Sequence, residues 1–187
     1  MPDKKEIEIK YPVTNADEII NTLNKGAEFK YEARQVDKYY NPPHRDFTKH
    51  PDGVVYEYLR LRSSDKGDSI NYKTWAPRTH AEEYESNISS LKDLERIFDI
   101  LDIKLLVTVD KIRKVWKLGD VEVCIDSVKE LGDNIELEYQ GDEEDVEAAR
   151  AILFSTLEKL GAKLGEIDTR GYAYNMLIKK GLVTLAI

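Results

Sequence analysis

Doublets of like charge, spaced two residues apart, recur along this chain and constrain its fold more than any other feature. They are Glu6/Glu8, Arg60/Arg62, Glu83/Glu85, Lys111/Arg113 and Glu136/Glu138. In a β-strand, residues i and i+2 point to the same face, so each doublet places two like charges on one side of a strand. The neighbours are mostly apolar: Leu59 and Leu61 flank Arg60, for example. The pattern predicts strands with one apolar face and one charged face.

Period-two alternation and turn residues together predict about eight strands. The first runs through residues 6–10, and the others are expected at about 34–41, 54–63, 69–75, 81–87, 105–117, 121–128 and 134–139. Apolar residues at helical spacing predict four helices, at about 14–25, 90–102, 143–160 and 169–180.

Short turns between neighbouring strands indicate hairpins rather than long crossovers. Pro51-Asp52-Gly53, Gly119-Asp120 and Gly132-Asp133 are such turns. Hairpins favour an antiparallel sheet, and closing the sheet removes its exposed edges. We therefore expect an α+β fold: a closed eight-stranded antiparallel β-barrel with flanking helices. A length of 187 residues with 41% hydrophobic composition fits a single domain, residues 1–187.

Composition excludes several classes of partner. A net charge of −8 argues against binding to duplex nucleic acid or to an anionic membrane, because both are held mainly by clustered Lys and Arg. Cys124 is the only cysteine and cannot form an intramolecular disulfide, and no apolar run approaches the length of a membrane span. We expect a soluble, cytoplasmic protein, and the sequence leaves open whether it is a homodimer.

The charged faces combine two sets of side chains with complementary chemistry. Carboxylates such as Glu6 and Glu8 are hard oxygen ligands suited to Mg²⁺ or Mn²⁺. Cations such as Arg60 and Arg62 are donors suited to phosphate oxygens. If they line one interior, the two sets predict a site for a metal and a polyphosphate. The competing interpretation is that the charged faces are simply solvated, in which case the doublets would point outward.

The ordered set of motifs resembles the CYTH superfamily, also called triphosphate tunnel metalloenzymes. The motifs are Glu6-Ile7-Glu8-Ile9-Lys10 (the ExExK signature), Asp37-Lys38-Tyr39-Tyr40, Leu59-Arg60-Leu61-Arg62, Tyr72-Lys73, Glu83-Tyr84-Glu85, Lys111-Ile112-Arg113, Asp126 and Ile135-Glu136-Leu137-Glu138. The resemblance covers nearly the whole chain and implies that the barrel is a tunnel for a triphosphate.

The resemblance also implies a role for each charged residue. The implied metal ligands are Glu6, Glu8, Asp126, Glu136 and Glu138. The implied phosphate ligands are Lys10, Arg60, Arg62, Lys73, Lys111 and Arg113. Tyr39 and Lys10 are the implied catalytic pair, although Tyr39 could equally be an ordinary aromatic residue of a strand. Glu83 and Glu85 are expected to support the site by orienting its basic residues.

Three activities remain open within this resemblance. We expect hydrolysis of tripolyphosphate, or of an organic triphosphate such as thiamine triphosphate, with release of orthophosphate. The alternative is a class IV adenylyl cyclase that converts ATP to cyclic AMP and pyrophosphate; the stretch 124–132 and Arg170-Gly171-Tyr172 look nearest to that branch. The third is a barrel that binds polyphosphate or nucleotide without catalysis.

Overall fold

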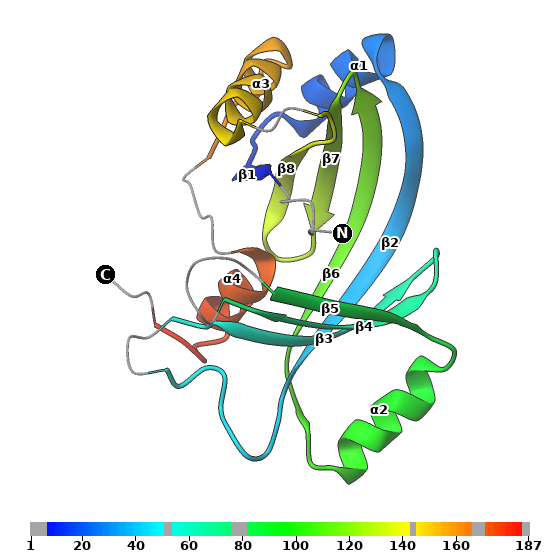
Figure 1. Ribbon diagram of the computed structural model, residues 1–187, viewed down its shortest axis with the longest axis vertical. Coiled ribbons are helices and arrows are strands. Elements are labelled where there is room, and N and C mark those ends of the chain that lie inside the picture. Colours follow the sequence, from blue (N-terminus) through cyan, green and yellow to red (C-terminus); the bar gives the residue numbers. More distant parts are fainter. Residues whose placement is uncertain (1–6, 51–53, 76–81, 143–144, 166–170, 185–187) are drawn as a thin grey trace. The chain divides into compact units, whose positions relative to one another are not determined.

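The computed structural model describes residues 7–50, 54–75, 82–142, 145–165 and 171–184. In these residues it has eight strands and four helices (Figure 1). The strands are β1 (Glu8–Pro12), β2 (Glu28–Asn41), β3 (Glu57–Ser64), β4 (Asp68–Thr74), β5 (Glu82–Ile88), β6 (Lys104–Leu118), β7 (Val121–Val128) and β8 (Gly132–Tyr139). The helices are α1 (Ala16–Gly26), α2 (Leu91–Ile100), α3 (Val146–Lys159) and α4 (Gly171–Lys179). The predicted α+β class is confirmed. No helix in the described part of the chain is long and apolar enough to cross a membrane.

The strands form one antiparallel sheet in the order β1-β8-β7-β6-β2-β3-β4-β5. The order ends on β1 and β5, and no hydrogen-bonded ladder joins these two strands within the described ranges. The predicted eight-stranded antiparallel sheet is therefore confirmed, whereas its closure into a barrel is not. Both edge strands are short, at 5 and 7 residues, which limits the backbone available for pairing with other chains.

The chain divides into two compact units. The first holds residues 1–33 and 111–169, and the second holds residues 34–110 and 170–187. The long strands β2 and β6 contribute residues to both units. The expectation of a single domain over residues 1–187 stays a prediction.

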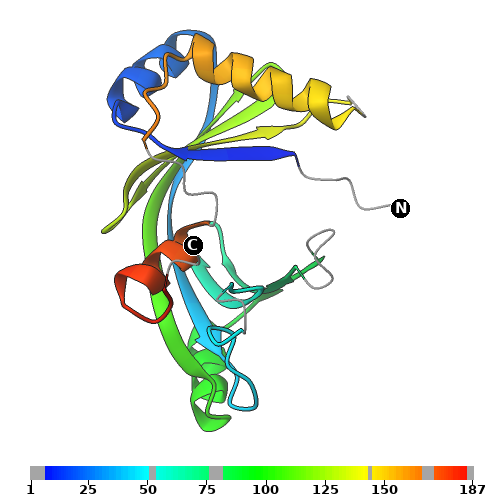
Figure 2. The same ribbon diagram turned by 90° about the vertical axis from the view of Figure 1, so that its left-hand side faces the viewer.

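In the first unit, α1 and α3 cover the same face of the strands (Figure 2). Alternate residues of β1, β7 and β8 point into this core, as period two requires. The buried residues of the core are Ile9, Val13, Ala16, Ile19, Leu23, Trp116, Val121, Val123, Ile125, Ile135, Leu137, Leu153, Leu157 and Leu160. Burial of a Val, Leu or Ile side chain contributes about 1.5–3 kcal/mol. This core packs against one face of the strands, and the opposite face of the same strands carries the charges.

In the second unit, α2 packs against β2, β3 and β4. The helix begins after Ser90, whose hydroxyl accepts a hydrogen bond from the Asp93 amide at 3.2 Å. Its Phe98 ring meets Tyr40 of β2 edge to face, with 5.0 Å between the ring centroids. Leu61 of β3 completes the buried centre of this core. The apolar face of the second unit is thus covered as the doublets predict.

The turn between β7 and β8 lies earlier than expected. Sequence analysis put it at Gly132-Asp133, but these residues begin β8, and the turn occupies residues 129–131. Glu130 adopts a left-handed conformation there, with φ 71°. The ladder extends this far because Ser127 lies opposite Asp133 and donates a hydrogen bond to its Oδ1 at 2.7 Å. The Gly119-Asp120 turn between β6 and β7 lies where predicted.

Candidate functional site: two charged faces

The first unit carries its charges on the strand face opposite the helix-covered core. Strand register aligns Lys10 of β1 with Glu136 of β8, and Glu136 in turn with Cys124 of β7. Two residues further along β7, on the same face as Cys124, Asp126 lies opposite Arg113 of β6. The same alternation that buries the apolar residues thus brings together charges that are distant in sequence.

Asp126 is the centre of this first face, and its side chain is fully buried. Its Oδ2 accepts hydrogen bonds from Lys111 Nζ at 2.9 Å and from Arg113 Nη2 at 2.7 Å, and its Oδ1 accepts one from Arg113 Nε at 2.7 Å. Burial acts to raise the pKa of Asp126, but the hydrogen bonds from Arg113 and the charge of Lys111 hold it well below the usual range. Asp126 is therefore an ionised carboxylate with both oxygens engaged by cations.

Glu136 extends the network to β1. Its Oε2 lies 2.5 Å from Lys10 Nζ and accepts a hydrogen bond from Arg113 Nη2 at 3.0 Å. Burial opposes ionisation, but the charges of Lys10 and Arg113 outweigh it and lower the pKa of Glu136 to about 2. Burial, together with the charge of Arg113, also lowers the pKa of Lys111 to about 8. The network joins Lys10, Lys111 and Arg113 to the two carboxylates of Asp126 and Glu136.

A row of carboxylates lies beside this network. Glu8 of β1 is opposite Glu138 of β8, and Glu138 is opposite Glu122 of β7. Like charges directly across a ladder repel, and a hard divalent cation would relieve that repulsion. Glu6 lies outside the described residues, and no three Asp, Glu, His or Cys side chains in the described part form a ready metal centre. Glu8 and Glu138 fit a cation better than Asp126, whose oxygens already accept from Lys111 and Arg113.

Sequence reasoning missed Glu122 as a member of this row. It alternates with Val121 and Val123, so its position on the charged face could be read from period two. The acidic residue two positions before it, Asp120, belongs to the predicted Gly119-Asp120 turn, so Glu122 did not stand out as part of a strand doublet. Only the strand register places it opposite Glu138.

The second unit repeats the pairing of an aspartate with an arginine on its own charged face. Arg62 of β3 lies opposite Asp37 of β2, and donates from Nε to Oδ1 at 2.6 Å and from Nη2 to Oδ2 at 2.7 Å. The Asp37 side chain is almost fully buried. Sequence reasoning noted Asp37 as part of a motif but gave it no role.

Arg60 differs sharply from Arg62. It lies opposite Tyr39 of β2 and Asn71 of β4, and its side chain is largely buried. Its Nε is a buried donor with no hydrogen-bond partner among the described residues. An ion pair to Glu85 is long, with 3.8 Å between Nη2 and Oε1. Within the described residues, Arg60 therefore retains a buried Nε donor that no acceptor satisfies.

Tyr39 is protonated at neutral pH. Burial and the nearby charge of Asp37 raise its pKa to about 12, although Arg60 and Arg62 act in the opposite direction. A phenol with that pKa can donate a hydrogen bond but is a poor general base. Tyr39 and Lys10 belong to different units, so their predicted pairing stays a prediction.

The two supporting glutamates lie beside basic residues of the same face. Glu83 Oε2 lies 3.0 Å from Lys73 Nζ, and Glu83 Oε1 accepts a hydrogen bond from Asn71 Nδ2 at 2.6 Å. Glu85 Oε1 accepts a hydrogen bond from the Ser69 hydroxyl at 2.8 Å. Burial disfavours the charge of Glu83, but Lys73 lowers its pKa overall. Glu83 thus pairs with Lys73, whereas the short contact of Glu85 is with Ser69, and the supporting role of the two glutamates stays a prediction.

Aromatic side chains lie on the charged face of the second unit, next to its basic residues. Tyr58 lies between Tyr39 and Trp75, and its ring meets both edge to face at centroid distances of 5.8 Å. Lys73 Nζ lies 5.3 Å from the centroid of the Trp75 ring. The end of the face near Trp75 is thus aromatic as well as basic.

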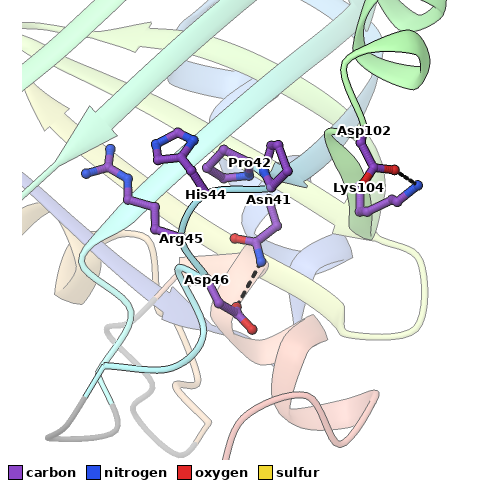
Figure 3. Close-up of a pocket in the computed structure, with 8 residues that line it drawn as sticks. Asn41, Pro42, His44, Arg45, Asp46, Asp102 and Lys104 are labelled. Atoms are coloured by element: carbon purple, nitrogen blue, oxygen red, sulfur yellow. Dashed lines mark hydrogen bonds and ion pairs between the residues drawn. The ribbon is translucent and has the colours of Figure 1, made fainter.

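A separate hollow of about 310 Å³ lies in the second unit, at the end of β2 and the start of β6 (Figure 3). Asn41 donates a hydrogen bond to Asp46 there at 2.9 Å, and Lys104 pairs with Asp102. The hollow is lined by Asn41, Pro42, Pro43, His44, Arg45, Asp46, Asp102 and Lys104. None of the predicted site residues lines it, so it is distinct from both charged faces.

Comparison with known proteins identifies the family. The CYTH domain model matches residues 4–172. MJ0240 of Methanocaldococcus jannaschii, which is named an adenylate cyclase on a provisional basis, is 32% identical over 139 residues, or 71% of this chain and 75% of that protein. The solved structure of PH1819 from Pyrococcus horikoshii OT3 is 28% identical with a TM-score of 0.72, and the match covers 94% of this chain and 99% of that one. HpAC1 from Hippeastrum, described as a candidate adenylyl cyclase with a dominant triphosphatase activity, is 15% identical with a TM-score of 0.62 over 97% of this chain and 99% of that one. The motifs, the charged faces and these matches agree, and the chain belongs to the CYTH domain family.

Proposed function

We propose that this protein is a divalent-metal-dependent phosphohydrolase that cleaves the terminal phosphoryl group from a triphosphate. The observation that carries the proposal is the buried Nε donor of Arg60, which has no hydrogen-bond partner in the part of the chain that the structure describes. Leaving a buried charged donor unsatisfied is costly, by more than the roughly 1–3 kcal/mol of a neutral group. A phosphate oxygen would satisfy it with a strong, charge-assisted hydrogen bond.

The other cations support an anionic ligand of several charges. On the first face, Lys10, Lys111 and Arg113 gather around Asp126 and Glu136. On the second face, Arg60, Arg62 and Lys73 come from adjacent strands β3 and β4. A single phosphate would not need so many donors, whereas a triphosphate carries charge along its whole length. Tripolyphosphate, thiamine triphosphate and ATP all have this feature.

The carboxylates would hold the metal, for which Mg²⁺ and Mn²⁺ suit the all-oxygen ligand set. Glu8 and Glu138 are the best placed, together with Glu6 as implied by the family resemblance. Asp126 and Glu136 are the other carboxylates of the proposed set, and both also fix cations. A metal bound there would supply charge neutralisation on the phosphate oxygens.

The chain's own residues would then bind and orient the substrate. Arg60, Arg62 and Lys73 donate to phosphate oxygens and stabilise the charge that builds up on the transferred phosphoryl group. Tyr39, protonated as its raised pKa requires, donates a hydrogen bond rather than removing a proton. Water attacks the terminal phosphorus, the bond to the bridging oxygen breaks, and orthophosphate leaves with a diphosphate as the second product.

A cyclase is the second candidate, and the aromatic end of the second face favours it. Tyr58 and Trp75 lie beside Lys73, where an adenine ring could stack while the phosphates reach the cations. The name of MJ0240 points the same way. Cyclisation would direct the 3′-hydroxyl of ATP at the α-phosphorus and release pyrophosphate, with no water consumed.

Product analysis with a matched pair of variants tests the proposal. Pure protein is incubated with Mg²⁺ or Mn²⁺ and with tripolyphosphate, thiamine triphosphate or ATP, and orthophosphate, pyrophosphate and cyclic AMP are quantified. We expect orthophosphate release that Arg60→Gln lowers by about 10–100-fold in kcat/KM, since a charged hydrogen bond is worth about 1.5–3 kcal/mol. Arg96→Gln, on the exposed face of α2, is the control and should leave the rate unchanged.

Two other outcomes would reject the hydrolase. Cyclic AMP with equimolar pyrophosphate would establish the cyclase instead. Tight, metal-dependent binding of a triphosphate with no product from any substrate would leave a binding protein.

A further inference from the structure

Two buried side-chain atoms in the described part of the chain have no hydrogen-bond partner, and both lie in the second unit. One is Arg60 Nε, and the other is Gln35 Oε1. Gln35 is only 7% exposed. A buried amide oxygen without a partner costs about 1–3 kcal/mol, and native proteins rarely keep one without a reason. A lone glutamine in a strand carries no motif, so the sequence predicts no role for Gln35.

Gln35 lies on the charged face of β2. It is two residues from Asp37 and four from Tyr39, so the three side chains point to the same side of the strand. Across the ladder it faces Ser64, two register positions from the Asp37–Arg62 pair. Within that pair, both Asp37 oxygens accept from Arg62. Gln35 thus lies on the same face of β2 as Asp37, whose carboxylate holds Arg62.

The chemistry of the orphan atom limits what can satisfy it. Oε1 of an amide is an acceptor, whereas the oxygens of an ionised phosphate are also acceptors and cannot bond to it. In the amide orientation that the structure shows, a ligand that donates is required, and water is the donor that a hydrolytic site must hold. An amide cannot take the proton from that water, but it can orient it, as a glutamine does in several GTPases.

We propose that Gln35 Oε1 accepts a hydrogen bond from the attacking water and aims it at the terminal phosphorus. This inference rests on the proposed hydrolysis. The water oxygen forms the new P–O bond, the bond to the diphosphate leaving group breaks, and the water protons pass to phosphate oxygens and solvent. Gln35 itself is unchanged by the reaction.

The position of Gln35 also orients the substrate. Along β2, Gln35 and Tyr39 are four residues apart, or about 13 Å at roughly 3.3 Å per residue. The Arg62 row lies between them, and Tyr58 and Trp75 lie beyond Tyr39. A triphosphate bound to Arg60 and Arg62 would therefore have its terminal phosphate toward Gln35 and any organic group toward Trp75.

The test replaces Gln35 in the full-length chain and separates stability from turnover. In Gln35→Leu the orphan oxygen is gone, so the melting temperature should stay equal or rise. The kcat for orthophosphate release should fall at least ~10-fold while KM stays within about 2-fold, since a lost transition-state contact lowers kcat alone. Gln35→Asn, which withdraws the amide by one methylene, should lower kcat in the same way and decides the question if the Leu variant does not fold. Gln140→Leu, the same change at the chain's other, exposed glutamine, is the control.

The outcomes distinguish this inference from the proposed function. If wild-type protein hydrolyses a triphosphate and both Gln35 variants retain its kcat, the role of Gln35 is overturned and the hydrolase stands. A rise in KM at constant kcat would also overturn it, because Gln35 would then bind substrate rather than water. If the wild type hydrolyses no triphosphate, both proposals fail together.

Discussion

Arg113 and Asp126 lie directly opposite each other on β6 and β7 and are joined by two parallel hydrogen bonds, each 2.7 Å long. Arg62 and Asp37 repeat this geometry on β3 and β2, at 2.6 and 2.7 Å. In both pairs the buried carboxylate engages Nε and Nη2, which fixes the plane of the guanidinium. The two units thus use the same device to hold an arginine on a charged strand face.

Removing one partner of a buried pair should destabilise the fold. We expect Asp126→Asn to lower the free energy of unfolding by about 3–5 kcal/mol, because it leaves Lys111 and Arg113 buried without their carboxylate. Urea titration followed by circular dichroism measures this. Asp99→Asn removes a partner of Arg96 that is 74% exposed and should cost no more than about 1 kcal/mol. Equal losses in the two variants would contradict the account.

Lowering the pH should reduce the free energy of unfolding as Glu136 and Asp126 of the first unit become protonated. The pKa of Glu136 is about 2 in the folded protein, against about 4.3 for a glutamate in an unfolded chain. Between these values the unfolded state binds more protons, so stability falls as pH is lowered through the window. The lowered pKa of Asp126 acts in the same direction. Urea titrations at several pH values, in buffer with EDTA, measure the free energy of unfolding. This free energy should depend less steeply on pH in Glu136→Gln than in wild type. Parallel curves for the two proteins would contradict the contribution of Glu136.

Tyr39 should act as a donor and not as a base. Because its pKa is raised to about 12, the profile of kcat against pH should show no ionisation of Tyr39 between about pH 6 and 10. Tyr39→Phe should lower kcat about 10-fold, as expected for a lost hydrogen bond of about 1.4 kcal/mol, without moving either limb of the profile. Tyr84→Phe, on the highly exposed Tyr84 of β5, is the control. An alkaline limb that disappears in Tyr39→Phe would make Tyr39 the base.

Metal binding should depend on the row of carboxylates. We expect Glu8→Gln and Glu138→Gln each to weaken Mn²⁺ binding at least ~10-fold, since each removes a charged oxygen ligand. Isothermal titration calorimetry without substrate measures this independently of turnover. Glu158→Gln, on the exposed side of α3, should bind Mn²⁺ as wild type does. Unchanged affinity in both ligand variants would place the metal elsewhere.

Period two sufficed to place most of the charged residues on the correct kind of face. The doublets Arg60/Arg62 and Lys111/Arg113 lie on β3 and β6, and the apolar residues between them face the other way, because side-chain direction in a strand depends only on parity. Element ends were less predictable. The strand expected at 34–41 begins at Glu28, since its first residues continue the ladder despite their exposure.

Pairing could not be predicted from sequence. Asp37 and Arg62 are 25 residues apart, and only strand register brings them opposite each other. Two arginines of the same doublet therefore differ: Nε of Arg62 donates to a carboxylate, whereas Nε of Arg60 has no partner among residues 7–50, 54–75, 82–142, 145–165 and 171–184. The isolation of Gln35 is likewise a property of the packed state, because an unsatisfied group is defined by what surrounds it.

The most direct test of the central claim follows the oxygen of water into the products. ATP or tripolyphosphate is turned over with Mg²⁺ or Mn²⁺ in oxygen-18 water. The products are then separated, and their oxygen-18 content is determined by mass spectrometry. Hydrolysis at the terminal phosphorus predicts orthophosphate that carries one solvent oxygen, a diphosphate product that carries none, and no product in EDTA. Cyclic AMP and unlabelled pyrophosphate, or the absence of any metal-dependent product, would contradict the account.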